Sequence, residues 1–348
     1  MPYARCIIFC LVWHATAAQC MLGYPADQPP QPYVGIAACF ATQSPQTIVA
    51  YTQKLHPDFI ELKTIRRYSH SGNHAPLTAP VATPDNFQLC PIHTTTPEVF
   101  YPAKRIDDSP HIALANSVGM PSASLPESIE YIRKIQDHLT QHCNKQPQLI
   151  LSVHGDSILD FESLARAGHE LGVSYVCANL SCPNLQSSSI PLYKNPEMVR
   201  IILKAMKKKL PATPLIAKIG MFENSELLLM EAVICAIAKA GAQGVYGINA
   251  VPINLLNQKN EPYFGENRKQ CGLSGAPIRE LALSFTGKAK RIIQKHNLNL
   301  TLFACGGVTS HEHVQLFAQK GADVVMSATG VMHNPDFSFR PPELRSKL

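Results

Sequence analysis

The chain has 348 residues, of which 45% are hydrophobic and 16% are charged, and its formal net charge at pH 7 is +6. This composition is that of an ordinary folded protein, which excludes a disordered or collagen-like chain and leaves room for one large α/β domain or two ordinary ones. The positive excess is small and scattered, so it suits anionic small ligands and does not predict nucleic-acid binding.

The cysteine pattern bears on the cellular compartment. Eleven cysteines are scattered along the chain without a C-x-x-C pair, and some lie inside apolar runs, such as Cys177 and Cys235. An odd number of scattered cysteines predicts reduced thiols in a cytoplasmic protein rather than a disulfide framework. His311 and His313 do not have a common zinc spacing, so we interpret them as a polar helix start and expect no metal site.

The N-terminal segment, residues 1–32, allows two interpretations. Arg5 is followed by an apolar run, Cys6–Trp13, and by the small residues Ala15–Ala18, which resembles a weak signal peptide. The run is too short to cross a bilayer as a helix. We favour an opening strand or hairpin, because the cysteines do not suggest export, and we expect no membrane anchor.

From residue 33 onwards, short apolar runs alternate with longer segments of helical period. Eight runs predict β-strands: Tyr33–Phe40, Phe59–Thr64, Leu149–Val153, Tyr175–Leu180, Leu215–Ile219, Gly244–Asn249, Leu300–Ala304 and Val324–Ala328. A ninth run, Ile112–Ala115, is short enough to be a loop. Three segments repeat apolar residues at spacings of three and four, which predicts helices packed on a sheet: Leu125–Leu139, Met198–Leu210 and Ile278–His296. Gly241 and Gly321 are expected to end helices in the left-handed conformation.

Eight strands that alternate with helices predict a (β/α)8 barrel, and an open doubly wound sheet is the alternative. Polar residues gather at the carboxyl ends of the predicted strands, where such barrels carry their active sites. The segment from Arg66 to Asp108 is rich in Pro, Thr, His and Ser and has little periodicity, so we expect an excursion over that end of the barrel. The expected organisation is an N-terminal segment (1–32), one barrel domain (33–340) and a short tail (341–348).

The stretch Asn179-Leu180-Ser181-Cys182-Pro183-Asn184 comes at the end of a predicted strand. Pro183 ends the strand and holds the thiol of Cys182 in place. The amides of Asn179 and Asn184 each offer a donor and an acceptor, the pair needed to recognise a flat heterocycle with imide edges. A turn around a buried structural cysteine is the alternative interpretation.

Glycine-rich loops follow the last two predicted strands, at Gly306-Gly307 and at Ala328-Thr329-Gly330. Glycines let backbone N–H groups approach a phosphate, and these two loops are the usual phosphate site of a barrel. Tight turns without a ligand are the alternative. No G-x-G-x-x-G sequence opens the first unit and there is no Walker sequence, so neither a nicotinamide dinucleotide nor an ATP fold is indicated.

Two lysines occur near the ends of predicted strands. Lys218 lies in the apolar run Leu215–Ile219, and a buried ammonium needs a partner. It could stabilise the negative charge that develops on a reduced cofactor ring, or its head could reach solvent at the strand end. Lys63 allows the same two interpretations.

Taken together, these stretches resemble the dihydroorotate dehydrogenase family, most closely its soluble class 1A group, over about residues 20–340. The matching pieces are Leu62-Lys63-Thr64, Ser71-Gly72-Asn73, Ala115–Pro121, Asn179–Asn184, Ala217-Lys218-Ile219, Ile248-Asn249, Gly272–Gly275, Cys305-Gly306-Gly307 and Ala328-Thr329-Gly330. The resemblance implies a (β/α)8 barrel that holds FMN and oxidises dihydroorotate to orotate in pyrimidine biosynthesis.

The resemblance also implies roles for individual residues. Cys182 would be the base that removes a proton from the substrate, with Lys63 beside substrate and flavin. The implied substrate-binding residues are Asn116, Val118, Gly119, Met120, Asn179, Pro183, Asn184, Asn249 and Ala250. The implied FMN-binding residues are Ala37, Ala38, Lys63, Thr64, Asn179, Lys218, Ile248, Gly275, Gly306, Gly307, Ala328 and Thr329. Leu185 to Asn195 would form a mobile lid.

A cysteine at position 182 favours the soluble class over the membrane-bound class, which carries serine there and uses quinone. Within the soluble class, the lid resembles that of the branch that uses fumarate as a homodimer. The other branch passes electrons to NAD through a separate iron–sulfur flavoprotein subunit.

Two departures from the family pattern keep other functions open. Cys39 replaces a usual glycine beside the flavin, where its side chain could crowd the ring, and Ala250 replaces the hydroxyl residue that normally follows Asn249. One alternative is a flavin barrel that acts on another pyrimidine. Another is a diverged barrel that binds a ligand or partner without turnover.

Overall fold

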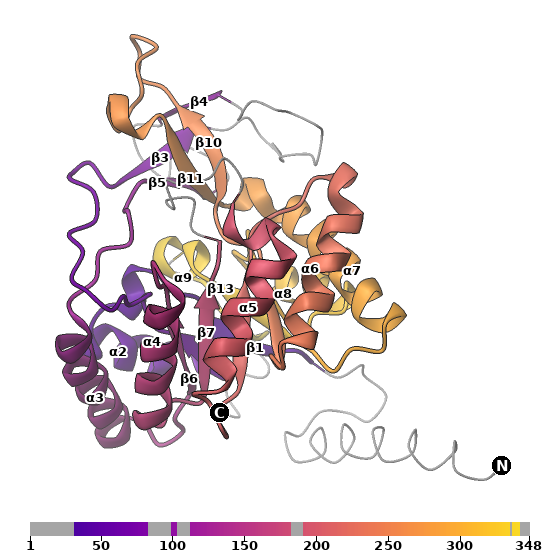
Figure 1. Ribbon diagram of the computed structural model, residues 1–348. Coiled ribbons are helices and arrows are strands. Elements are labelled where there is room, and N and C mark those ends of the chain that lie inside the picture. Colours follow the sequence, from indigo (N-terminus) through magenta and orange to yellow (C-terminus); the bar gives the residue numbers. More distant parts are fainter. Residues whose placement is uncertain (1–30, 83–98, 103–111, 182–190, 335, 342–348) are drawn as a thin grey trace. The chain divides into compact units, whose positions relative to one another are not determined.

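The computed structural model describes residues 31–82, 99–102, 112–181, 191–334 and 336–341 (Figure 1). The chain separates into two compact units, Met1–Pro32 and Tyr33–Leu348. The predicted N-terminal hairpin falls outside the described residues, except for its last two positions. All the elements given below belong to the second unit.

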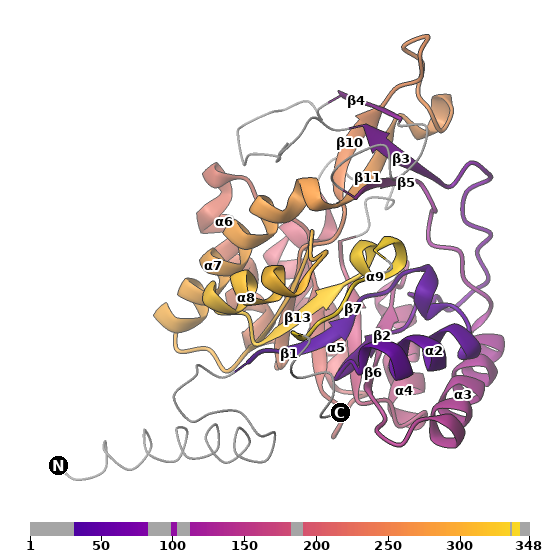
Figure 2. The ribbon, with the colours of Figure 1, turned by 180° about the vertical axis from the view of Figure 1, so that it is seen from behind.

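A closed barrel of eight parallel strands forms the centre of the second unit (Figures 1 and 2). In order around the barrel, the strands are β1 (Tyr33–Ile36), β2 (Phe59–Glu61), β6 (Gln148–Val153), β7 (Tyr175–Asn179), β8 (Leu215–Lys218), β9 (Gly244–Gly247), β12 (Thr301–Cys305) and β13 (Val324–Ser327). The barrel closes where β13 pairs with β1, with Val324 opposite Tyr33. All eight predicted strands and the (β/α)8 architecture are confirmed, and the open doubly wound sheet is excluded.

Helices cover the outside of this barrel. They are α2 (Pro45–Leu55), α3 (Leu125–His142), α4 (Ile158–Glu170), α5 (Pro196–Lys207), α6 (Leu227–Lys239), α7 (Arg279–Lys295), α8 (His311–Gln319) and the short α9 (Thr329–His333). Short 3-10 turns add η1 (Phe40–Thr42), η3 (Leu192–Lys194), η4 (Asn224–Glu226), η5 (Glu266–Arg268) and η6 (Ala276–Ile278). The three predicted helices are confirmed as α3, α5 and α7. Gly241 and Gly321 have φ of 85° and 94°, as predicted for left-handed helix ends, and α8 starts at His311.

A second, smaller sheet lies beyond the carboxyl ends of the barrel strands (Figure 1). It contains β3 (Thr78–Ala82), β4 (Val99–Pro102), β5 (Ala113–Asn116), β10 (Val251–Leu255) and β11 (Gln270–Gly275), and it also closes. The interpretation of Ile112–Ala115 as a loop is wrong, because β5 pairs with both β3 and β11. The expected excursion from Arg66 to Asp108 supplies β3 and β4 to this sheet.

The barrel interior changes from apolar to polar along the strands. Side chains two positions apart on a strand point to the same face. One buried cluster inside the barrel includes Phe59, Ile150, Cys177, Ile216, Tyr246 and Phe303. Two residues further along four of these strands come Glu61, Ser152, Asn179 and Lys218, all buried. The polar residues therefore form the last interior layer at the carboxyl end.

No helix among the described residues is long and apolar enough to cross a membrane.

Candidate active site

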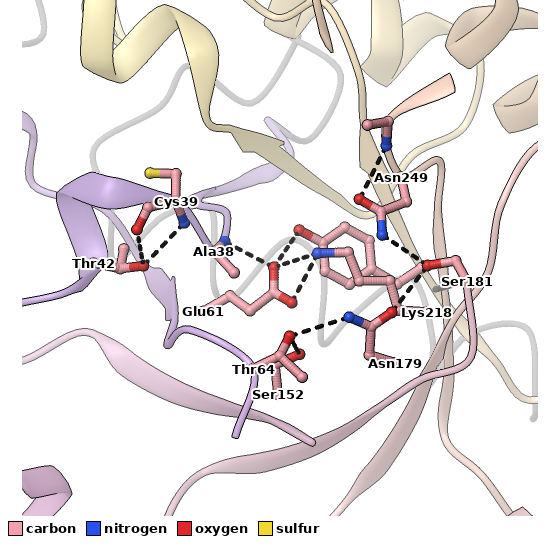
Figure 3. A network of polar contacts seen from close by, with 12 residues as sticks. Ala38, Cys39, Thr42, Glu61, Thr64, Ser152, Asn179, Ser181, Lys218 and Asn249 are labelled. Atoms are coloured by element: carbon pink, nitrogen blue, oxygen red, sulfur yellow. Dashed lines mark hydrogen bonds and ion pairs between the residues drawn. The ribbon is translucent and has the colours of Figure 1, made fainter. Parts of the chain in front are cut away.

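A buried ion pair crosses the polar end of the barrel (Figure 3). The ammonium of Lys218 donates to both carboxylate oxygens of Glu61, at 2.8 Å each. The same carboxylate accepts from the backbone N–H of Ala38 at 2.9 Å and from the hydroxyl of Tyr246 at 2.9 Å. Glu61 is fully buried, and Lys218 is 5% exposed. Lys218 therefore does not reach solvent, which rules out that interpretation of its position.

The surroundings of Lys218 keep its charge in place. Burial alone would lower the pKa of Lys218, but the Glu61 carboxylate raises that pKa above its ordinary value. The ammonium also lies 4.5 Å from the centre of the Tyr246 ring, a cation–π contact. Burial raises the pKa of the Cys305 thiol to about 11 and that of Cys177 well above its usual range, so both thiols are neutral at pH 7.

A chain of side-chain hydrogen bonds runs beside this ion pair (Figure 3). Asn249 donates to the hydroxyl of Ser181 at 2.8 Å, and Ser181 donates to the amide oxygen of Asn179 at 3.0 Å. Asn179 in turn donates to Thr64 at 3.1 Å, and Thr64 lies 2.9 Å from the hydroxyl of Ser152. The predicted residues Asn179, Asn249 and Thr64 are thus held in one connected row.

The backbone around this row is also held by polar contacts. The imidazole of His154 donates to the carbonyl of Asn179 at 2.9 Å, and burial lowers the pKa of His154, so the ring is neutral. The backbone N–H of Ala250 donates to the amide oxygen of Asn249 at 2.9 Å. That bond fixes the Asn249 amide so that its nitrogen faces Ser181.

The second sheet brings further predicted substrate residues to this end. Asn116, the last residue of β5, donates to the carbonyl of Gly272 on β11 at 3.1 Å. A Cβ on Gly272 would come within 2.8 Å of the Ala250 methyl and 3.2 Å of the Asn116 amide nitrogen. Asn116 and Ala250 therefore lie on either side of a glycine whose missing side chain leaves them room.

The predicted residues Val118, Gly119 and Met120 form a turn beside the asparagine row. Asn73 holds this turn, because its backbone N–H donates to the Val118 carbonyl at 3.0 Å, and a Cβ on Gly119 would meet its amide at 2.8 Å. The sulfur of Met120 lies 3.9 Å from the amide nitrogen of Asn179. Gly119 and Met120 have positive φ, of 72° and 51°.

The predicted phosphate loops lie together at the ends of β12 and β13. Gly306 and Gly307 have φ of 128° and 74°. Side chains hold three consecutive carbonyls of this loop: Arg279 donates to Gly307 at 2.8 Å, Ser327 to Val308 at 2.7 Å and Asn334 to Thr309 at 2.9 Å. The adjacent helix α9 starts at Thr329, and its N-cap residue Ala328 makes no side-chain cap.

Two other predicted cofactor residues border these loops. Ile248 follows β9 and donates its backbone N–H to the Cys305 carbonyl at 2.9 Å, and a Cβ on Gly306 would lie 3.4 Å from its side chain. Gly275 has φ of 95°, and a Cβ there would lie 2.0 Å from the Ile112 carbonyl oxygen. The close approach of β5 therefore requires glycine at position 275 independently of any ligand.

Lys63 has no carboxylate within ion-pair distance among the described residues, and its ammonium lies 5.9 Å from the centre of the Phe40 ring. Burial lowers the pKa of Lys63 below its ordinary value. Cys39 follows the predicted flavin neighbours Ala37 and Ala38, and its side chain packs in the core, with its sulfur pointing away from Glu61 (Figure 3). Burial raises the pKa of the Cys39 thiol to about 11. The expected crowding of a ring by this side chain stays a prediction.

Three predicted residues, Cys182, Pro183 and Asn184, lie outside the described residues, as does most of the predicted lid. Ser181, which directly precedes Cys182 in the sequence, is the last described residue before them. The lid's last residues form η3, where Tyr193 donates its hydroxyl to the Met221 carbonyl at 2.7 Å.

Several members of the site are not among the residues predicted from the sequence, notably Glu61, Tyr246 and Ser181. Glu61 gave a usable signal, because a carboxylate in the apolar run Phe59–Leu62 needs a partner for the same reason as Lys218 does. Tyr246 gave none, since a tyrosine in a buried strand is ordinary. No group of three or more metal-ligating side chains occurs in the part of the chain that the structure describes.

Comparisons with known proteins agree on one family. The protein-family model described as dihydroorotate dehydrogenase matches residues 91–341 of this chain. The chain is 34% identical to the dihydroorotate dehydrogenase of Dictyostelium discoideum over 238 residues, which are 66% of this chain and 63% of that protein. It is 26% identical to the catalytic subunit of dihydroorotate dehydrogenase B (NAD(+)) of Thermotoga maritima over 244 residues, which are 70% and 81% of the two chains.

A relative with another substrate name also matches. The chain is 25% identical to the NAD-dependent dihydropyrimidine dehydrogenase subunit PreA of Escherichia coli over 232 residues, which are 65% of this chain and 54% of that protein. The match to the Dictyostelium protein spans less than two thirds of that protein's length. The family model covers well over half of this chain, and its match includes Asn179, Asn249, Lys218 and both glycine loops. The chain belongs to the dihydroorotate dehydrogenase family.

Proposed function

We propose that this protein binds FMN and oxidises dihydroorotate to orotate, a step of pyrimidine biosynthesis. Proteins of this family are FMN-dependent oxidoreductases. The observation that carries the proposal is the row of Asn249, Ser181, Asn179 and Thr64, which fixes amide groups at the carboxyl end of the barrel next to Cys182 in sequence. Residues 33–340 would form the FMN-binding domain.

The residues at the last two strands fit the phosphate of FMN. The first N–H groups of any helix lack partners within it, and α9 has no side-chain cap for them. Gly307 adds a backbone segment without a side chain. A Cβ at this position would lie 2.7 to 2.9 Å from atoms of Arg279, so only glycine fits there. In this proposal Gly306, Gly307, Ala328 and Thr329 surround the phosphate and ribityl chain.

The ring of FMN would lie near the polar interior layer. Lys218, Lys63 and Thr64 would face it, with Ala37 and Ala38 at the end of β1 and Ile248 at the end of β9. FMN supplies the hydride acceptor. The chain contributes fixed hydrogen-bond donors and two ammonium groups, of which only Lys218 has a carboxylate partner among the described residues.

The pyrimidine ring would be bound by amide groups. Asn116, Asn179, Asn184 and Asn249 offer donors and acceptors that match its carbonyl and N–H edges and its carboxylate. In the described arrangement, Asn179 and Asn249 are pre-oriented by Ser181, so little side-chain entropy remains to be lost on binding. The turn containing Met120 would cover the same ring from the second sheet.

Cys182 would take the proton from the substrate carbon while hydride leaves for the flavin. A thiolate is a much stronger base at neutral pH than a serine hydroxyl, since cysteine ionises at about pH 8.5. In this proposal Lys63, an ammonium without a carboxylate partner among the described residues, lies beside Cys182 and favours the thiolate. Leu185 to Asn195 would close over the substrate as a lid.

We propose fumarate as the electron acceptor, in a cytoplasmic homodimer. Relatives named for NAD(+) give the second candidate, in which a separate subunit carries electrons to NAD. A second candidate substrate is another dihydropyrimidine, which is favoured by the match to a dihydropyrimidine dehydrogenase subunit and by Ala250 in place of a hydroxyl residue.

The test is anaerobic spectroscopy of the purified protein. The proposal expects a bound flavin that dihydroorotate bleaches and fumarate restores, with orotate as the product. Recovery only with NAD and a partner subunit would replace the acceptor. A flavin bleached by dihydrouracil and not by dihydroorotate would replace the substrate, and a protein that binds no FMN would support a diverged binding barrel.

Cys182→Ser should slow flavin reduction by dihydroorotate at neutral pH. The matched control is Cys235→Ser on α6, a half-buried cysteine outside the barrel interior, which should leave the rate unchanged. Equal rates for wild type and Cys182→Ser would remove the role given to Cys182 while leaving FMN binding intact.

A further inference from the structure

Glu61 is a carboxylate with no access to solvent and four hydrogen bonds. It accepts two bonds from Lys218, one from the Ala38 N–H and one from the Tyr246 hydroxyl, all at 2.8 to 2.9 Å. These donors come from β8, from the end of β1 and from β9. A single side chain on β2 therefore ties together three other strands of the barrel.

The ion pair spans the interior rather than joining neighbouring strands. Around the barrel, β6 and β7 separate the strand of Glu61 from the strand of Lys218. Beneath the pair lies the aromatic layer of Phe59, Tyr246 and Phe303, in which the Phe59 and Phe303 rings are 5.6 Å apart. Each charge stabilises the other on this apolar floor, because burying an unpaired charge is far more costly than burying a pair.

The pair also determines the net charge at the end of the barrel where Lys218 and Ala38, both predicted to contact the flavin, lie. An ammonium has three donors, and Glu61 accepts from Lys218 at both of its oxygens, which leaves one N–H for another group. The neighbouring thiols of Cys177 and Cys305 are neutral. Glu61 is therefore the counter-charge of Lys218 within the described residues, and the pair is neutral as a unit.

We propose that Glu61 is a positioning residue that holds Lys218 and the backbone of Ala38 in place beside the flavin and, by neutralising Lys218, sets the reduction potential of bound FMN. This inference rests on the proposed binding of FMN. Reduction adds negative charge to the flavin, so an uncompensated ammonium nearby favours the reduced form, and a neutral pair favours it less. Lys218 then acts mainly as an oriented donor.

The test uses three variants of the full chain: Glu61→Gln, Lys218→Met and the double variant. The readout is the midpoint potential of bound FMN, measured by equilibration with a reference dye. Glu61→Gln should raise the affinity for reduced over oxidised FMN at least tenfold, which is an upward shift of about 30 mV for a two-electron couple. Lys218→Met should shift the potential downward, and the double variant should lie between the two single variants.

The opposite signs separate an electrostatic role from a purely structural one. Loss of packing would weaken binding of both flavin forms and would not shift the potential in opposite directions. The control is Glu130→Gln, which removes an exposed pair with Lys134 on α3 and should leave the potential unchanged. Shifts of the same sign in the two single variants, or no shift in Glu61→Gln, would overturn the inference.

The experiment remains decisive if one variant fails to fold or if the proposed substrate is wrong. If Glu61→Gln does not fold, the double variant, which carries no charge at either of the two positions, is compared with Lys218→Met, and equal potentials refute the role of Glu61. If the wild type binds FMN and dihydroorotate does not reduce it, the proposed substrate fails and the potentials still test Glu61. If turnover is normal and the potentials do not move, the inference alone fails.

Discussion

Ser181→Ala tests whether the asparagine row is a pre-formed binding device. The Ser181 hydroxyl donates to Asn179 at 3.0 Å and accepts from Asn249 at 2.8 Å, so the variant removes both bonds. Each neutral hydrogen bond contributes about 1 kcal/mol net, which gives about 2 kcal/mol for the two. Asn179 keeps its bond to Thr64, and Asn249 keeps its bond from the Ala250 N–H, so both amides stay in place but each can rotate more freely.

If this preorganisation supports ligand binding, its loss should weaken orotate binding by about 10- to 30-fold, since 1.4 kcal/mol corresponds to a factor of ten. The assay is titration of the oxidised protein with orotate, followed by the change in the flavin spectrum. Ser163→Ala is the matched control, because that hydroxyl donates only to the Leu159 carbonyl on the exposed face of α4. An orotate dissociation constant within twofold of wild type in Ser181→Ala would refute the reasoning.

Three further predictions concern the frame around the site. Gly307→Ala should lower the flavin-to-protein ratio and cost more than about 1 kcal/mol of stability, because φ is 74° and the new Cβ would clash with the backbone of Arg279. The control is Gly172→Ala, where φ is 65° and the space around the glycine is open, and it should keep full flavin content. Burial and a nearby arginine lower the pKa of His313 to about 4, so the unfolded state binds more protons between pH 6.5 and 4; the free energy of unfolding in urea should fall across that window, and His313→Gln should flatten the fall. Arg340→Ala removes bonds to the His56 carbonyl and to Asp58, and should cost about 1–3 kcal/mol in the same urea assay while leaving the flavin potential unchanged.

The barrel was predictable because its signals are local. Each strand is a short apolar run bounded by turn residues, and each helix carries an apolar stripe, so the alternation survives even where the ends are misjudged by a few residues. The predicted strand Tyr33–Phe40 ends four residues earlier in the structure, at Ile36, because Phe40 begins a 3-10 turn. Errors of this kind did not affect which strand ends carry the site.

The second sheet was not predictable in the same way. Its strands have four to six residues, and two of its pairings, β5 with β11 and β4 with β10, join segments more than a hundred residues apart, so no local periodicity identifies those strands as partners. The strand Thr78–Ala82 contains a proline, which normally argues against a strand. Where β5 pairs with β11, a Cβ on Gly275 would lie 2.0 Å from the Ile112 carbonyl oxygen, a close approach that only the folded chain reveals.

The surroundings of Cys39 and Ala250, the two departures from the family pattern, could also be learned only from the structure. A cysteine at position 39 predicts a crowded ring, and the structure adds that its side chain is buried in the core, where Thr42 donates to its carbonyl at 3.0 Å. Ala250 lacks the hydroxyl of the family pattern, yet its backbone N–H orients Asn249. The sequence could identify these substitutions as unusual, whereas their consequences depend on which way each side chain points.

The short segment from Glu61 to Thr64 joins the two networks of the site. In the register of β7 and β8, Asn179 lies opposite Lys218, yet their side chains take different partners. Lys218 pairs with Glu61 at the end of β2, and Asn179 donates to Thr64 three residues further on. Between them, Leu62 is 3% exposed and anchors the segment in the core.

This arrangement explains why one strand end can serve two chemical tasks. Glu61 faces the barrel interior, where it fixes a charge, and the chain leaves the strand immediately afterwards, which frees Lys63 and Thr64 from strict alternation. Thr64 can then turn its hydroxyl toward Asn179 and Ser152 while Lys63 approaches Phe40. Because the segment ends a strand, a one-residue shift in the register of β2 would move Glu61 out of reach of Lys218 and displace Thr64 from Asn179 together. Electrostatic control and amide orientation therefore depend on the same pairing of β2 with β1 and β6.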